Sequence, residues 1–89
     1  MKKIKVIIEH KIESLSWLFS KCNIIKKINF IKFNRNNIKT MCGMFSRCKY
    51  FEEINFYKFN TDNVTNMSEL FYECSLLNKY IFQILIPLM

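Results

Sequence analysis

Cysteine is the residue type whose spacing in this sequence most invites a chemical interpretation. Three of the four cysteines recur at one constant interval, at Cys22, Cys48 and Cys74, and the fourth is Cys42. Thiols could ligate a metal or act as nucleophiles, but the chain has no Cys-x-x-Cys pair and only one histidine, His10. We therefore expect no metal site. A disulfide within the series would leave one member unpaired, so we expect the three cysteines to fill buried positions.

Other side chains that could do acid–base or phosphate chemistry do not form a site either. The chain has a single glycine, Gly43, so it contains no glycine-rich phosphate loop. The adjacent Glu52 and Glu53 would point to opposite faces of a strand. We therefore expect no enzymatic activity and no cofactor.

Asparagine recurs at the same interval as cysteine. Asn34 and Asn60 form one pair of equivalent positions, and Asn37 and Asn63 form another. With one glycine and one proline in the chain, turns must depend on Asn, Asp, Ser and Thr, whose side chains bond to nearby backbone groups. We interpret both pairs as residues that satisfy the backbone of their own or the neighbouring repeat.

The spacing of these residues belongs to a repeat that runs through most of the chain. Positions separated by the cysteine interval hold side chains of the same kind, as in Phe19, Phe45 and Phe71, in Ile28, Ile54 and Tyr80, and in Phe30, Phe56 and Phe82. A fixed period of roughly 20 to 50 residues is typical of a solenoid. We divide a single domain, 1–89, into a partial repeat 1–14, full repeats 15–40 and 41–66, a partial repeat 67–82 and a divergent tail 83–89.

Each repeat contains two successive patterns. Ser14, Thr40 and Asn66 favour helix N-caps, and the apolar residues after them are spaced at i, i+3, i+4 and i+7, which predicts a short helix. Alternating residues then predict short strands, stacked in a parallel sheet, over residues 26–31, 52–57 and 78–83. The expected fold is an α/β repeat solenoid, with short parallel strands on one face and short helices on the other.

The chain is basic. Lysine and arginine number 14 against 7 aspartates and glutamates, which gives a formal net charge of +7. Such an excess favours anionic partners, but the abundance of Lys, Asn, Ile and Phe is also the usage expected of an AT-rich coding sequence. A binder of nucleic acid or of an anionic surface therefore stays an alternative, with nucleic acid the less favoured partner.

Two apolar segments could direct the chain to a membrane. The segment that starts at Met1 is cut off at Glu9, too early for a signal peptide. The segment 80–89 is interrupted by Gln83 and Pro87 and has about half the length of a membrane span. We expect neither an export signal nor a transmembrane helix in this chain, and the residues alone do not indicate a compartment.

The segments 41–48 and 59–71 carry a family resemblance. They read Met-Cys-Gly-Met-Phe-Ser-Arg-Cys and Phe-Asn-Thr-Asp-Asn-Val-Thr-Asn-Met-Ser-Glu-Leu-Phe. This resembles the BspA-like leucine-rich repeat surface proteins, over about residues 4–82. The resemblance implies a leucine-rich-repeat-like solenoid at the cell surface or outside the cell, with a role in adhesion and protein binding.

Two departures from that family are visible. Asn29 and Asn55 stand where the family repeat has a strand Asp, and the long array and export signal of family members are missing here. The chain therefore reads as a fragment, a truncated copy or a degenerate member.

The outward face of the predicted strands is the candidate partner-binding surface. Its residues are Lys27, Asn29, Ile31, Glu53, Asn55, Tyr57 and Lys79. The leading hypothesis is a non-enzymatic protein-interaction or adhesion module whose partner is a protein or another cell-surface ligand. The alternatives are the basic binder and a non-functional remnant that self-associates through exposed terminal coils.

Overall fold

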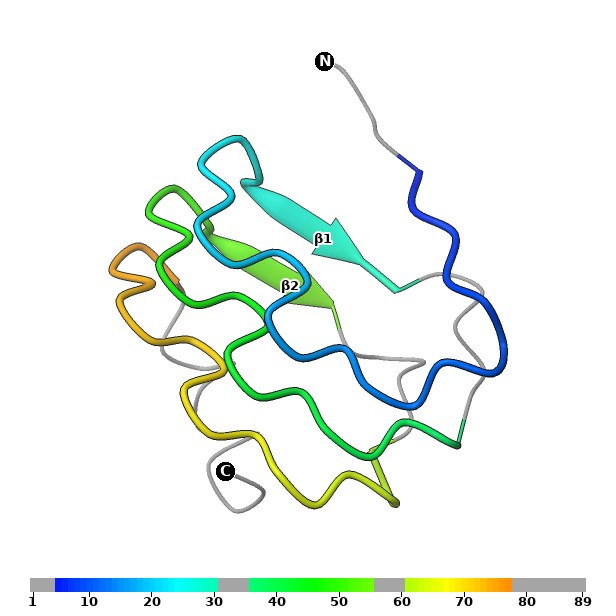
Figure 1. Ribbon diagram of the computed structural model, residues 1–89. Coiled ribbons are helices and arrows are strands. Elements are labelled where there is room, and N and C mark those ends of the chain that lie inside the picture. Colours follow the sequence, from blue (N-terminus) through cyan, green and yellow to red (C-terminus); the bar gives the residue numbers. More distant parts are fainter. Residues whose placement is uncertain (1–4, 31–35, 56–60, 78–89) are drawn as a thin grey trace.

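The described residues contain the same series of turns three times. The computed structural model describes residues 5–30, 36–55 and 61–77. Within them, three rows of turns run side by side, coloured blue to cyan, green, and yellow to orange in Figure 1. We call residues 15–22, 41–48 and 67–74 the first, second and third turn rows. Each row starts one full repeat after the previous one, so the sequence repeat is also the repeat of the backbone.

Two short strands pair behind the turn rows. Strand β1 is Lys27–Asn29 and strand β2 is Glu53–Asn55, and they form a parallel two-stranded sheet (Figure 1). The register pairs Ile28 with Ile54, again at an offset of one full repeat. Both strands lie within ranges expected for strands, and the third expected strand, 78–83, lies outside the described residues.

The prediction of helices after Ser14, Thr40 and Asn66 is wrong. The described residues include all three segments and contain no helix. The turn rows are instead series of four-residue turns. In the first row, the N–H of Leu18 donates to the carbonyl of Leu15, at 3.3 Å. Cys22 donates to Phe19 in the same way, at 3.0 Å.

Left-handed backbone explains why these segments are not helical. Within each turn row, two residues four positions apart have a positive φ between 57° and 62°: Trp17 and Lys21, Gly43 and Arg47, Glu69 and Glu73. A right-handed helix cannot contain such residues. Repeated four-residue turns nevertheless place apolar side chains at i, i+3, i+4 and i+7, which is the helical spacing.

The backbone–backbone hydrogen bonds between turn rows all run in one direction. The N–H of Leu15 donates to the carbonyl of Thr40 at 2.9 Å, and the N–H of Met41 donates to the carbonyl of Asn66 at 2.9 Å. The same pattern is followed, at every second residue, by Trp17, Phe19 and Lys21 toward the second row and by Gly43, Phe45 and Arg47 toward the third. Each row thus donates to the next and accepts from the previous one.

Aromatic stacking fills the core between the turn rows and the sheet. The ring centroid of Phe45 lies 5.7 Å from that of Phe19 and 5.8 Å from that of Phe71. Phe51 packs against the middle ring at 4.8 Å. The fully buried side chains all belong to the middle of the stack or its direct neighbours: Ile38, Met41, Met44, Phe45, Cys48, Phe51 and Leu70.

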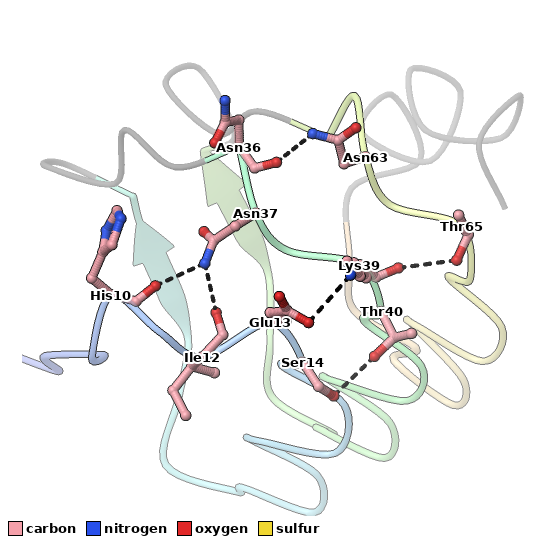
Figure 2. A network of polar contacts seen from close by, with 10 residues as sticks. All are labelled: His10, Ile12, Glu13, Ser14, Asn36, Asn37, Lys39, Thr40, Asn63 and Thr65. Atoms are coloured by element: carbon pink, nitrogen blue, oxygen red, sulfur yellow. Dashed lines mark hydrogen bonds and ion pairs between the residues drawn. The ribbon is translucent and has the colours of Figure 1, made fainter.

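Polar side chains connect successive repeats (Figure 2). The Thr40 hydroxyl donates to the Ser14 hydroxyl, 26 positions earlier in the chain, at 2.9 Å. The Asn37 side-chain amide donates to the carbonyl of His10 at 2.7 Å, and Asn63 donates to the carbonyl of Asn36, one repeat on. The predicted backbone-satisfying role is therefore confirmed for Asn37 and Asn63, whereas Asn34 and Asn60 lie outside the described residues.

Candidate functional site

The outer face of the β1–β2 sheet is the part of the predicted binding surface that the structure describes. Lys27 and Asn29 are exposed, whereas Ile28 between them is half-buried against the core. In β2, Glu53 is exposed and Ile54 is buried. Strand geometry produces this division because successive side chains point to opposite faces.

The register places several predicted surface residues next to each other. Lys27 pairs with Glu53, and the backbone of Asn29 pairs with that of Asn55. Ile31, Tyr57 and Lys79 lie outside the described residues. The sheet therefore brings four of the seven predicted residues into two pairs, which are separated by the inward-facing pair of Ile28 and Ile54.

The ion pair on this face contributes little to stability. The Lys27 ammonium lies 3.7 Å from a Glu53 carboxylate oxygen, and both side chains are more than half exposed. Exposed pairs of this kind contribute about 0 to 1 kcal/mol. The face offers hydrogen bonds and paired charges to a partner.

Ion pairs also connect other equivalent positions of successive repeats. Lys39 lies 3.4 Å from Glu13, and Arg47 lies 3.4 Å from Glu73. These pairs, like Lys27 with Glu53, join residues that are one full repeat apart. They neutralise part of the basic charge of the first half of the chain.

The cysteine series is a structural element of the core. The thiol of Cys48 donates to the carbonyl of Phe19, with sulfur and oxygen 3.0 Å apart, and Cys74 donates to Phe45 at 2.9 Å. Burial raises the pKa of the Cys48 thiol, and it raises the pKa of Cys74 to about 11. Both thiols are therefore protonated at neutral pH and are poor nucleophiles.

None of the four cysteines is in a disulfide, and Cys22 and Cys42 are half-buried. The described parts of the chain contain no cluster of three or more His, Cys, Asp or Glu side chains that could hold a metal ion. They also contain no helix long and apolar enough to cross a bilayer.

The single tryptophan and the single glycine of the chain are packed together. Trp17 and Gly43 occupy equivalent positions of the first two repeats, and both have a φ of 62°. A Cβ at Gly43 would overlap the indole ring of Trp17. Gly43 is therefore required for the close approach of the ring as well as for its own backbone conformation.

A second surface consists of three exposed apolar side chains at equivalent positions. Ile24, Tyr50 and Leu76 follow the cysteine series by two residues and are 74%, 52% and 53% exposed. We call these three residues the apolar ridge. Their recurrence is visible in the sequence, but the next position, Ile25, Phe51 and Leu77, is equally apolar and faces inward.

Comparison with known proteins gives one assignment. No curated protein and no solved structure matches this chain. A family model described as "Mycoplasma protein of unknown function, DUF285" matches residues 2–84, which is nearly the whole chain. The chain therefore belongs to the DUF285 family.

Proposed function

We propose that this chain is a non-enzymatic protein-interaction module, a section of a leucine-rich-repeat-like solenoid of the BspA-like surface-protein kind. The offset of one full repeat recurs in the sheet register, in the bonds between turn rows and in the stacking of Phe19, Phe45 and Phe71. A stack of equivalent repeats presents side chains at a regular spacing over an extended face, and such a face suits a protein ligand.

The pairing of β1 with β2 is the single observation that carries the proposal. It brings Lys27 beside Glu53 in the outer face, and the backbone of Asn29 beside that of Asn55, about 4.8 Å away. Neighbouring donors and acceptors at strand spacing match the polar groups of an extended polypeptide. The resemblance to adhesins supports a place at the cell surface and a role in adhesion.

Binding of the intact chain to a panel of purified cell-surface and matrix proteins tests this function. We expect at least one protein to bind, and the Lys27→Ala/Asn29→Ala double variant to bind it about thirtyfold more weakly, since truncation of interface residues of this kind costs on the order of 1 kcal/mol each. The matched control is Lys11→Ala, because Lys11 is exposed and lies away from the sheet. If the unaltered chain, the double variant and the Lys11→Ala control all bound the ligand equally, the binding site would lie outside the sheet face. This result would contradict the assignment of that face as the binding surface.

A further inference from the structure

The three residues of the apolar ridge belong to three turn tips that lie side by side. The tips follow the first, second and third turn rows and form one edge of the stack, on the left in Figure 1. Ile24, Tyr50 and Leu76 are each more than half exposed. Among the described residues, theirs is the repeat position at which all three side chains are large, apolar and exposed.

The ridge does not belong to the core. The core side of each tip is filled by the next residue, as with Phe51, which is fully buried next to the exposed Tyr50. Packing of the three repeats therefore does not require apolar side chains at the ridge. Exposed apolar side chains that gather at one edge of a fold suit a contact with another apolar phase.

Lysine side chains flank the ridge. Lys21, Lys26 and Lys49 are exposed, each within three residues of a ridge residue in the sequence, and none forms an ion pair within the described residues. The nearby Arg47 and Glu73 neutralise each other, and the exposed Glu52, two residues after Tyr50, offsets one of the three lysine charges. With a net charge of +7 on the whole chain, this edge is attracted to an anionic surface.

The size of the ridge and its apolar side chains favour one of three possible anionic partners, which are a protein, a bilayer and nucleic acid. Three half-exposed side chains offer on the order of 300 Å² of apolar surface, whereas a specific protein interface buries about 800 Å² on each partner. A bilayer accepts a small apolar ridge, because its headgroup region deforms around inserted side chains. Nucleic acid offers phosphates to the lysines but no apolar phase for Ile24 and Leu76.

We propose that the apolar ridge, with the lysines that flank it, docks this chain on the surface of an anionic phospholipid bilayer. Ile24 and Leu76 enter the boundary between headgroups and acyl chains, the phenol of Tyr50 lies at the headgroup level, and Lys21, Lys26 and Lys49 contact lipid phosphates. This surface is separate from the outer face of the sheet, so the proposal does not rest on the protein-binding function.

Co-sedimentation of the intact chain with vesicles tests the proposal. We expect binding to vesicles of phosphatidylcholine mixed with phosphatidylglycerol, and much weaker binding to phosphatidylcholine alone. The Ile24→Asn/Leu76→Asn variant should bind the anionic vesicles at least about tenfold more weakly. The control is Ile7→Asn, which removes an exposed apolar side chain away from the ridge and should leave binding unchanged.

A second pair of variants keeps the test decisive if the asparagine variant does not fold. Lys26→Gln and Lys49→Gln should each weaken binding to the anionic vesicles by about fivefold, whereas Lys11→Gln should not. Absence of binding to anionic vesicles would overturn the proposal. Undiminished binding of the Ile24→Asn/Leu76→Asn variant to the vesicles would also overturn it. A third contrary result is a purified protein that binds the chain only when the ridge residues are present, while the vesicles do not bind the chain.

Discussion

The thiol of Cys74 donates a hydrogen bond to the backbone carbonyl of Phe45, with the sulfur 2.9 Å from the oxygen. The same carbonyl accepts the N–H of Cys48 at 3.2 Å, so it has one donor from its own repeat and one from the next. Cys48 makes the equivalent thiol contact with Phe19. The cysteine series therefore connects each repeat to the one before it, in addition to filling space.

Removal of this contact should destabilise the stack. We expect Cys48→Ala to lower the free energy of unfolding by about 1 to 2 kcal/mol, because the substitution leaves a small cavity and removes a donor from the Phe19 carbonyl. Urea unfolding followed by circular dichroism measures the change. Cys42→Ala is the control: this half-buried thiol lies outside the series, and its loss should cost less than about 0.5 kcal/mol. Equal losses would refute the structural role of the series.

Stability should fall at alkaline pH because of Cys74. Burial raises its pKa from 9.0 to about 11, so between these values the unfolded chain loses the thiol proton while the folded chain keeps it. The unfolded state then binds fewer protons, and the free energy of unfolding decreases as pH rises from about 9 to 11. Urea unfolding at a series of pH values measures this slope. It should be shallower in Cys74→Ala, and an identical slope in both proteins would exclude Cys74 as its source.

The contact between Gly43 and Trp17 gives a third prediction. Gly43→Ala should destabilise the fold by about 1 to 3 kcal/mol, because a Cβ overlaps the indole ring and alanine disfavours a φ of 62°. Displacement of the ring should also shift the tryptophan fluorescence of the folded protein. Glu69→Ala, at the equivalent position of the next repeat, retains a non-glycine residue at a φ of 57° and should change stability by less than about 0.5 kcal/mol. Similar losses in both variants would exclude the overlap as the cause.

A fourth prediction concerns the side-chain amide of Asn37. It donates to the carbonyls of His10 and Ile12, at 2.7 Å and 3.3 Å (Figure 2). In Asn37→Asp an anionic acceptor would face two carbonyl oxygens, so we expect a loss of about 2 kcal/mol, more than in Asn37→Ala. Asn36→Asp adds the same charge at the neighbouring, exposed position and should be nearly neutral. Thermal unfolding of the three variants ranks them, and a loss in Asn36→Asp as large as in Asn37→Asp would indicate a general charge effect.

The stacking and the register of the described repeats could be predicted from the sequence because identical side chains recur at one interval. Phe19, Phe45 and Phe71 stack since equivalent positions of successive repeats must face the same neighbours. The positions of β1 and β2 follow from the alternation around Ile28 and Ile54 for the same reason. The polar role of Asn37 and Asn63 follows from the scarcity of other turn-forming residues.

The form of the turn rows could not be predicted in this way. Helices and repeated four-residue turns space apolar residues identically, and the sign of φ decides between them. Gly43 is the one residue at these positions whose type marks a positive φ, whereas Trp17 and Glu69 adopt the same conformation without any such mark.

The single direction of the backbone bonds between turn rows makes the backbone of the repeat interchangeable. Each row meets its successor with the same N–H donors and its predecessor with the same carbonyl acceptors, so removal of residues 41–66 would leave the N–H of Leu15 opposite the carbonyl of Thr40 and bring the N–H of Trp17 opposite the carbonyl of Ser68. The new junction would have the hydrogen bonds of the old one. Genes of this kind can therefore lengthen or shorten by whole repeats without leaving unpaired backbone groups between the turn rows, so side-chain contacts such as that of Trp17 with Gly43 decide which repeats can be removed.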